Sequence, residues 1–364
     1  MAAETQHDAR GVARQFQFHG EFVGAVPYGA GHINDTYRVE MVRDGISTRY
    51  ILQRISREVF KNPIALMENV RRVTEHLECK FAGTPGIGRT VLRLIPTARG
   101  GFWHRDERGD YWRAFAFIEG ARGYDVAQSE QHAFEAARAF GRFQTRLSDL
   151  PGPRLHETIP DFHHTPKRFA ALEQAVAADA AGRAGAARSE IEFALSRRRL
   201  AGALLEAGLP ERVIHNDTKL NNVLLDESTG EGLCVIDLDT VMPGLAPYDF
   251  GDLVRSAASS APEDEREVSK VHLRFPMFVA LARGYLAGAG AWLTRDEKRC
   301  LAPAAKVMAF ELGMRFLADH LAGDAYFKAR RAGHNLDRAR AQFKLVESIE
   351  AQEARMRSVV EAEG

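Results

Sequence analysis

The chain has 364 residues, of which 45% are hydrophobic and 27% are charged, so it has room for two hydrophobic cores, and domain-scale disorder is not expected. Lysine plus arginine and aspartate plus glutamate number 49 each, so no global field attracts nucleic acid or an anionic membrane. The three cysteines are widely spaced, which argues against a disulfide framework and against a zinc site.

The N-terminal sequence and the lengths of the apolar stretches predict the cellular location of the protein. Residues 1–8 lack the basic start and apolar run of a signal peptide, and no apolar stretch reaches the length of a membrane span. The basic run at residues 197–199 is interpreted as a solvated helix face. We therefore expect a cytoplasmic monomer with no nucleic-acid or membrane partner.

The first third of the chain predicts an antiparallel sheet, because β-branched and aromatic residues alternate between glycine-containing turns. A helix is expected from about Pro63 to Leu77, with its apolar side chains on one face. The glycine-rich stretch 83–88 is interpreted as a loop. The predicted strands are residues 22–27, 36–42, 48–55, 89–95 and 111–118.

After residues 119–120 the hydrophobic pattern acquires the period of a helix. The predicted helices cover residues 127–148, 166–207, 265–290, 296–321 and 336–361, and the second of these stretches is expected to be interrupted near Gly182 and Gly185. These patterns predict an α+β protein with a small β-rich lobe, residues 1–118, followed by a larger α-helical lobe, residues 119–364.

A polar segment in the second lobe carries the residue types that phosphoryl transfer needs. Asp217 and Asn222 are separated by four residues, the spacing of a kinase catalytic loop. In such a loop the aspartate accepts the proton of the acceptor hydroxyl and the asparagine oxygen reaches a metal ion. The strands expected at 223–225 and 233–236 form a hairpin that returns Asp237 beside Asn222. We predict Asp217 as the catalytic base and Asn222 and Asp237 as Mg²⁺ ligands; a polar surface turn is the alternative.

The tripeptide Asp249-Phe-Gly251 matches the metal-binding motif of protein kinases by its letters alone. It follows Pro243 and Pro247 and does not end the hairpin strand, so metal binding is assigned to Asp237. Asp249 is expected to cap a helix or to hold the catalytic loop by accepting hydrogen bonds. Asp239 is left open between a second metal contact and a structural role.

A glycine-rich turn in the first lobe, Gly29-Ala-Gly31, is expected to let the backbone approach the phosphates of ATP. A plain hairpin turn is the alternative interpretation. The chain contains no Gly-x-x-x-x-Gly-Lys-Ser/Thr sequence, which excludes a P-loop kinase.

A kinase-like lobe also needs a cation on its third strand and an acid on the following helix. The strand offers Arg54 or, on its opposite face, Gln53, and the helix offers Glu68. Arg54 with Glu68 is the physically attractive pair, but the strand register leaves the choice open. Phe117 and Glu119, at the end of the last predicted strand, are also assigned to the nucleotide site.

Six longer motifs make the chain similar to a known family. They are Tyr28–Tyr37, Arg49–Ile55, Glu157–His163, His215–Asn222, Val235–Gly244 and Arg315–Lys328. These motifs resemble the N-acetylhexosamine 1-kinases, a family of the aminoglycoside phosphotransferase-like superfamily, which has the two-lobe protein-kinase fold. The resemblance extends from about Val23 to Glu350.

The resemblance implies an enzyme that uses ATP and Mg²⁺ to phosphorylate the anomeric hydroxyl of N-acetylglucosamine or N-acetylgalactosamine, giving the α-1-phosphate. It implies the same roles for Asp217, Asn222 and Asp237. The side chains assigned to the sugar are His32, Asn34, Arg315 and Tyr326.

Two alternatives stay open. One is a kinase for another small alcohol, such as another hexose, choline, homoserine or an aminoglycoside. A cationic acceptor would call for an acidic or aromatic pocket, which Arg315 near the acceptor argues against. The other is a binding-only pseudokinase, which would be expected to lack the base or a metal ligand. The sequence does not separate the two N-acetylhexosamines, which differ in the orientation of one hydroxyl.

Overall fold

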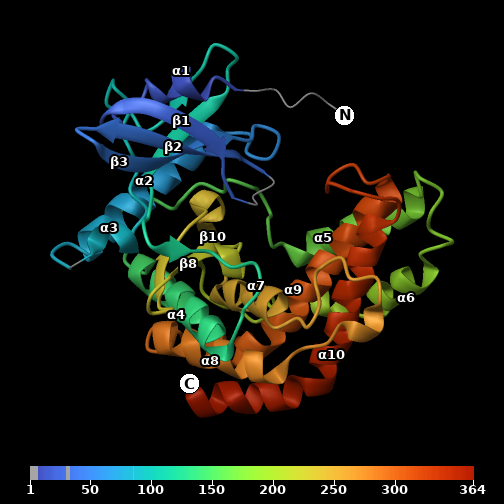
Figure 1. Cartoon of the computed structure of the whole chain (residues 1–364). Helices are drawn as coiled ribbons and strands as arrows, with labels where there is room; N and C mark the ends of the chain where they lie inside the picture. The colour runs from blue at the N-terminus through green and yellow to red at the C-terminus, as the bar shows by residue number, and fades with distance from the viewer. Residues whose placement is uncertain (1–6, 30–32, 85) are drawn as a thin grey trace. The chain divides into compact units, whose positions relative to one another are not determined.

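The computed structural model describes residues 7–29, 33–84 and 86–364 (Figure 1). The chain divides into two compact units, each made of three segments. The first unit is Met1–Ala121, Leu150–Ile159 and Cys234–Val241. The second unit is Arg122–Asp149, Pro160–Leu233 and Met242–Gly364. The predicted boundary between residues 118 and 119 stays a prediction.

The first unit is built on a five-stranded antiparallel sheet with the order β1-β2-β3-β5-β4. Its strands are β1 (Glu21–Pro27), β2 (Asp35–Arg43), β3 (Ile46–Ile55), β4 (His104–Arg105) and β5 (Tyr111–Ala116). Figure 1 shows β1, β2 and β3 side by side in blue. The sheet buries Val39, Leu52 and Trp112, and α1 (Ala9–Ala13) adds to the same core. Four of the five predicted strands are confirmed.

The predicted strand at residues 89–95 is wrong. The chain forms the short helix α3 (Ile87–Thr90) and then an extended stretch in which Leu94 makes a single bridge to Phe115. Val91, Leu94 and Ile95 are buried. The alternation of apolar and polar residues in this stretch therefore reflects the burial of its apolar side chains. The stretch pairs with β5 at too few positions to form a strand of the sheet.

The predicted helix near Pro63 is confirmed as α2 (Pro63–Lys80). Asn62 caps its N-terminus by accepting from the backbone N–H of Ala65, and Pro63 occupies the first turn, where its missing N–H costs nothing. The apolar face that the sequence predicts, which includes Leu66 and Val70, is buried.

The second unit is mostly helical. Its helices are α4 (Glu130–Leu147), α5 (Thr165–Ala178), α6 (Arg188–Ser196), α7 (Ala246–Ala257), α8 (Phe275–Ala289), α9 (Arg295–Ala322) and α10 (His334–Glu363), with 3₁₀ turns η1 (Arg198–Ala201) and η4 (Val268–Lys270). Helix α4 packs on α8, and α9 packs on both α7 and α10 (Figure 1). The α4–α8 crossing is close because Gly284 faces the backbone of α4, where an added Cβ would lie 2.1 Å from the carbonyl oxygen of Phe134.

One predicted helix is shorter than expected and one helix was missed. The interruption expected near Gly182 and Gly185 is confirmed, because Asp179, with a φ of 38°, ends α5 and α6 begins only at Arg188. The helix predicted at 265–290 begins only at Phe275, because the preceding stretch carries η4 and a bridge from Leu273 to Ser259. Helix α7 was not predicted, because Pro243 and Pro247 dominate the local sequence signal.

Short strands position the segment that was predicted to carry the chemistry. In the second unit β7 (Arg212–Ile214) pairs with β10 (Met242–Gly244). The predicted hairpin is formed by β8 (Val223–Asp226) and β9 (Gly232–Val235), next to β6 (Ala121–Arg122). A β-rich first unit and a larger helical second unit confirm the predicted α+β class.

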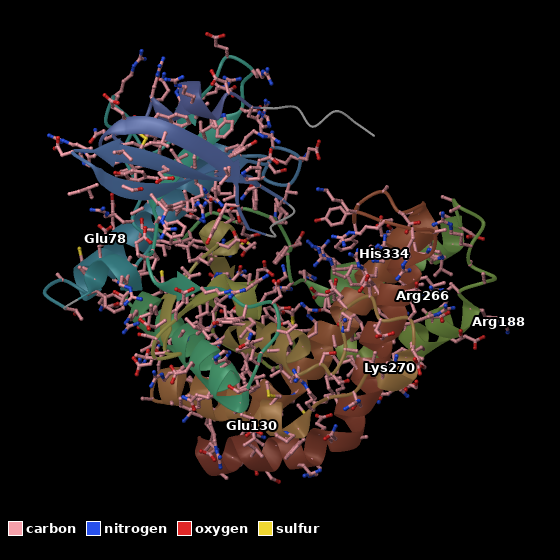
Figure 2. The ribbon with its side chains drawn as sticks, viewed as in Figure 1. Glu78, Glu130, Arg188, Arg266, Lys270 and His334 are labelled. Atoms are coloured by element: carbon pink, nitrogen blue, oxygen red, sulfur yellow. The ribbon has the colours of Figure 1, made fainter. Side chains whose placement is uncertain are left out.

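Charged side chains on the helices of the second unit pair locally. Figure 2 labels Arg188 and Lys270, which bond Glu192 and Glu267 on their own elements. In the basic run, Arg197 and Arg198 form ion pairs with Glu350 of α10 and Glu173 of α5. The contacts agree with the interpretation of this run as a solvated face. None of the helices in the described residues combines the length and apolar character needed to cross a membrane.

Candidate active site

The loop that contains Asp217 is held by hydrogen bonds to Asp249, in the first turn of α7. The backbone N–H groups of His215 and Asn216 donate to its two carboxylate oxygens at 2.8 and 2.7 Å, and Gln144 donates at 2.6 Å. Burial raises the pKa of Asp249, while the two backbone donors favour its charged form. The expectation that Asp249 holds the catalytic loop is confirmed.

Asp217 lies directly after Asn216, which has a left-handed backbone with φ of 65°. Asparagine enters this conformation more easily than most residues. Lys219 Nζ lies 2.8 Å from one Asp217 oxygen and 3.0 Å from the other. Burial opposes the charged form of Asp217, but Lys219 outweighs it and lowers the pKa of the carboxyl. Asp217 is therefore ionised at neutral pH, as a proton acceptor must be.

Asn222 ends the 3₁₀ turn η2 (Leu220–Asn222), and its amide is oriented by the loop. Its Nδ2 donates to the backbone oxygen of Asp217 at 2.8 Å and to Asp217 Oδ2 at 3.3 Å. Because the amide nitrogen is used in this way, Oδ1 is left as an acceptor that suits a hard cation.

Asp237 belongs to the first unit and precedes the 3₁₀ turn η3 (Leu238–Thr240). It is exposed and has a left-handed backbone with φ of 58°, a costly conformation that often marks a functional position. Its carboxylate and the Asn222 amide oxygen are the donor types that Mg²⁺ takes. They belong to different units, so their predicted juxtaposition stays a prediction.

The donor set around such an ion would be sparse. Among residues 7–29, 33–84 and 86–364, no three or more histidine, cysteine, aspartate or glutamate side chains are grouped to hold a metal.

The geometry favours a structural role for Asp239, which the sequence left open. Its side chain is buried, and its two oxygens are bonded to Arg113 and to Asn34, the latter at 2.7 Å. Its backbone oxygen accepts from Thr158 at 2.7 Å. The other end of the Asn34 amide accepts from the backbone of Ser56 at 2.9 Å. Asn34, predicted to contact the sugar, thus has both amide ends engaged inside the first unit.

Arg113 of β5 is a residue that the sequence reasoning missed. The strand register places Gln53 between Thr36 and Arg113. Gln53 donates to Thr36 at 3.0 Å and accepts from Arg113 at 3.1 Å, and Arg113 continues to Asp239. The sequence does contain a signal for this residue, because Arg113 lies inside an otherwise apolar strand. A charge buried in this way requires a partner.

The predicted pair of Arg54 with Glu68 is wrong. Arg54 bonds Asp35, its cross-strand neighbour, and lies 3.4 Å from Asp110. Glu68 bonds His156 at 2.9 Å, and this bond lowers the pKa of the Glu68 carboxyl. Arg54 therefore pairs with acids of its own sheet region, Asp35 and Asp110, whereas Glu68 of α2 pairs with His156. Whether either side chain contacts a nucleotide stays a prediction.

The residues assigned to the other part of the nucleotide site lie together in the first unit. The ring of Phe117 packs edge-on against Tyr28 at 5.7 Å and carries the guanidinium of Arg49 at 4.4 Å. Arg49 also forms an ion pair with Glu119. Gly29 has a φ of 83° and nothing within 4 Å of an added Cβ. Gly31 and His32 lie outside the described residues.

Arg315 and Tyr326, the two side chains of the second unit that are assigned to the sugar, both lie against the ring of Phe327. The Arg315 guanidinium, on α9, lies 5.5 Å from the ring centres of both Phe162 and Phe327. Tyr326 is 63% exposed, and its ring lies 4.8 Å from that of Phe327. The structure thus connects Arg315 and Tyr326 through the ring of Phe327.

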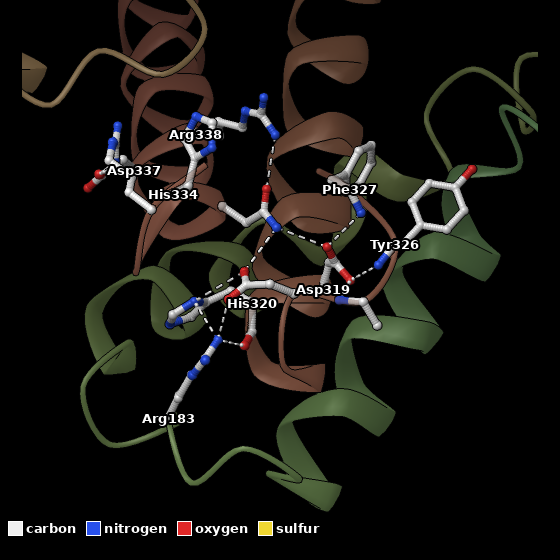
Figure 3. Close-up of polar contacts among 12 residues, drawn as sticks. Arg183, Asp319, His320, Tyr326, Phe327, His334, Asp337 and Arg338 are labelled. Atoms are coloured by element: carbon white, nitrogen blue, oxygen red, sulfur yellow. Dashed lines mark hydrogen bonds and ion pairs between the residues drawn. The ribbon is translucent and has the colours of Figure 1, made fainter. Parts of the chain in front are cut away.

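Asp319, one turn after Arg315 on α9, anchors the loop that carries Tyr326 (Figure 3). Its carboxylate accepts from the backbone N–H groups of Ala325, Tyr326 and Phe327 at 2.8–3.0 Å. Asn335 of α10 donates to the same carboxylate at 2.9 Å. In Figure 3 the Tyr326 side chain extends away from these contacts.

Comparisons with known proteins agree with this arrangement. The model of the APH phosphotransferase enzyme family matches residues 24–297, more than half of the chain. An aminoglycoside phosphotransferase from Alicyclobacillus acidocaldarius is similar in structure with a TM-score of 0.62 and 13% identity, covering 99% of both chains. A microcompartment-associated aminopropanol kinase has a TM-score of 0.60 and 16% identity, covering 94% of this chain and 98% of that one.

A choline kinase from Cryptosporidium parvum has a TM-score of 0.57 and 12% identity, covering 97% of both chains. At these identities the structural similarity shows the fold alone. It identifies the α+β protein more specifically as one with the kinase-like fold of these enzymes. The family match and the loop geometry lead to the same conclusion: the chain belongs to the APH phosphotransferase enzyme family.

Proposed function

We propose that this phosphotransferase uses ATP and Mg²⁺ to phosphorylate the anomeric hydroxyl of N-acetylglucosamine or N-acetylgalactosamine, giving the α-1-phosphate. The observation that carries the reaction class is the loop of Asp217 and Asn222, held by Asp249. The choice of sugar depends on the sequence motifs that resemble N-acetylhexosamine 1-kinases.

Asp217 is the proposed catalytic base. Its lowered pKa keeps the carboxylate ionised, so it can accept the proton of the sugar hydroxyl as the oxygen attacks the γ-phosphorus of ATP. The bond between that phosphorus and the bridging oxygen breaks, and ADP leaves with the electron pair. Asn222 and Asp237 would hold Mg²⁺, which when bound neutralises charge on the phosphate oxygens.

The nucleotide is assigned to the first unit. The Phe117 and Tyr28 rings with the Arg49 guanidinium offer a surface against which a base can stack. The open backbone at Gly29 supports close approach of a phosphate. Roles for Gly31, Arg54, Glu68 and Glu119 at this site are part of the proposal.

The acceptor is assigned to the second unit. Within the described residues the Arg315 guanidinium contacts two rings and no acceptor atom, so its donors are available to sugar hydroxyls or an acetamide oxygen. Tyr326 is exposed and offers a planar face and a hydroxyl. His32 completes the proposed sugar contacts, together with Asn34, whose amide nitrogen has a second N–H besides the one bonded to Asp239.

A kinase for another small alcohol is the second candidate, since the similar structures include an aminopropanol kinase and a choline kinase. Arg315 is the observation that separates the two. A guanidinium beside the acceptor repels an amine and bonds a neutral sugar. The monomeric state and the cytoplasmic location stay predictions.

The test is a panel of N-acetylhexosamines, other hexoses and amino alcohols, each incubated with ATP and Mg²⁺. Phosphorus NMR locates the new phosphate. We expect a sugar 1-phosphate from one or both N-acetylhexosamines, and the ratio of their kcat/KM values gives the preference. A 6-phosphate product, or turnover of an amino alcohol with no sugar turnover, contradicts the proposal.

A further inference from the structure

A buried pair of side chains, His163 and Glu311, supports the loop of Asp217 in addition to Asp249. His163 precedes α5, and its Nδ1 lies 2.8 Å from Glu311 Oε1 on α9. Its Nε2 lies 2.9 Å from the backbone oxygen of Asn216. Thr165 donates to the other Glu311 oxygen at 2.6 Å. The side chains of His163 and Glu311 are 7% and 1% exposed.

The partners of His163 determine its protonation. A backbone carbonyl only accepts hydrogen bonds, so Nε2 must carry a proton toward Asn216. An ionised carboxylate also only accepts, and the lowered pKa of Glu311 favours that form, so Nδ1 carries a proton toward Glu311. An imidazolium with a carboxylate satisfies both contacts and leaves the buried pair with no net charge.

The atom that His163 holds lies next to the proposed base. Asn216 is in the left-handed region, its N–H donates to Asp249, and its carbonyl accepts from His163. The two peptide groups of Asn216 are therefore each bonded, one to Asp249 and one to His163. In the peptide that joins Asn216 to Asp217, the carbonyl accepts from His163 and the N–H donates to His215 Nδ1 at 3.3 Å. These bonds hold a left-handed conformation that asparagine enters more easily than most residues but that is still sparsely populated.

We propose that His163 and Glu311 are positioning residues that orient Asp217 through the Asn216 carbonyl and connect the loop to the acceptor-binding part of α9. Glu311 and Arg315 are four residues apart on this helix, so they share a face. Phe162, the neighbour of His163, packs against the Arg315 guanidinium. The inference rests on the proposed function, because it assigns Asp217 as base and Arg315 as acceptor contact.

Charged and titratable groups from three helices face the pair. Burial disfavours the imidazolium, but Glu311 of α9 outweighs burial and, with Asp252 of α7, raises the pKa of His163. Burial also works against the Glu311 carboxylate, but His163 and then Arg315 lower its pKa. Tyr248 of α7 packs against the imidazole, and Arg168 of α5 interacts with both Glu311 and Arg315.

The sign of the pH dependence follows from these directions. Because the pKa of His163 is raised in the folded protein, its ion pair contributes its full stabilisation below the ordinary histidine pKa. That stabilisation is lost as the pH rises through the pKa of His163 in the folded protein. The lowered Glu311 pKa gives a contribution that is lost only as pH falls below the ordinary glutamate value. We therefore expect the support to weaken at alkaline pH.

The first experiment needs no substrate. Histidine NMR titration of the full chain, with His163→Gln to assign the signal, should show an imidazolium that persists well above about pH 6.5, the ordinary histidine value. In Glu311→Gln the midpoint should fall toward or below that value. A neutral His163 at pH 7 in the wild type overturns the inference.

The second experiment measures kcat and KM against pH. His163→Ala should lower kcat about 100-fold, the size expected when a reacting group is displaced by about 1 Å, with the KM for ATP unchanged. Glu311→Gln should lose activity at pH 8 and recover it as the pH falls through the His163 midpoint that NMR gives for this variant. Wild-type kcat in both variants, or no recovery at lower pH, contradicts the inference.

The matched control is His334→Gln. His334 also pairs with a carboxylate, Asp264 at 3.0 Å, and Figure 2 labels it at the start of α10. It should leave the kinetic pH profile unchanged. If the wild type phosphorylates no sugar while the NMR result holds, the proposed function fails. If the sugar is phosphorylated and His163 is neutral, only the positioning inference fails.

Discussion

At the scale of single residues, the proposed site depends on buried carboxylates that accept hydrogen bonds from backbone N–H groups. Asp249 accepts from two consecutive backbone N–H groups, and its own backbone oxygen accepts from Thr218. A buried carboxylate is costly by itself, and these donors offset the cost while fixing the loop. Changing such a residue should therefore affect both stability and geometry.

Asp249→Asn should lower the free energy of unfolding by about 2–3 kcal/mol, because one of the two loop donors then faces an NH₂ group. We expect kcat to fall with it, since the loop loses its anchor. Urea unfolding and steady-state kinetics measure the two effects. Asp179→Asn is the control, because Asp179 also accepts from two backbone N–H groups, those of Arg183 and Ala184, but through the single oxygen Oδ1, which an amide oxygen can replace. It should leave both kcat and the free energy of unfolding nearly unchanged.

Asp217→Asn should lower kcat by about 10²–10⁴-fold, the contribution of a positioned general base, and should leave nucleotide binding intact. Kinetics together with ATP titration measure both properties. The neighbouring variant Asn221→Ala removes a bond to Asp125 and should have little effect on kcat. Full activity in Asp217→Asn would show that another group takes the proton.

At the scale of elements, α9 carries much of the acceptor side. It presents Glu311, Arg315 and Asp319 at intervals of four residues, so all three lie along one face. Asp319 fastens the loop of Tyr326 to this face, and Asn335 adds a contact from α10 (Figure 3). The proposed sugar contacts Arg315 and Tyr326 are thus positioned by one helix and a loop bonded to it.

Asp319→Asn should raise the KM for the acceptor about tenfold and leave the KM for ATP unchanged, since the loop loses acceptors for its backbone donors. Initial rates with each substrate varied in turn measure this. Asp296→Asn is the control, because Asp296 is exposed in the first turn of the same helix and pairs only with Arg299 among the described residues. Equal KM values in Asp319→Asn and wild type would remove Tyr326 from the proposed sugar site.

At the scale of the whole molecule, the proposed reaction draws residues from both units. The first unit contains Gly29, Phe117 and Asp237, and the second contains Asp217 and Asn222. The proposed function assigns the nucleotide and its metal ion to residues of both groups. Binding should therefore stabilise the whole chain in a metal-dependent way.

ATP at about 100 times its Kd should stabilise the folded protein by about 2.7 kcal/mol, but only when Mg²⁺ is present. Asp237→Asn should remove the Mg²⁺-dependent part of the rise in Tm, and EDTA should do the same in the wild type. Asp44→Asn is the control, because Asp44 is also exposed with a left-handed backbone, φ of 53°. A metal-dependent rise in Asp237→Asn equal to wild type would contradict the metal assignment.

Local features could be predicted from the sequence because they depend on neighbours in the chain. The period of two in β1 to β3, the apolar face of α2 and the hairpin of β8 and β9 all follow from short-range spacing. The spacing of Asp217 and Asn222 predicted the reaction class for the same reason, and the family match supports that class.

Only the tertiary structure decided which distant residues meet. Residues 89–95 alternate like a strand but lack a partner along their length, because periodicity reports burial and not pairing. Arg113 bonds Asp239 across 126 positions, and His163 bonds Glu311 across 148. The sequence by itself determined most of the strands and long helices and the residue types of the loop. The partners of its buried charges were decided by the fold, because a buried charge takes whichever opposite group the packing brings to it.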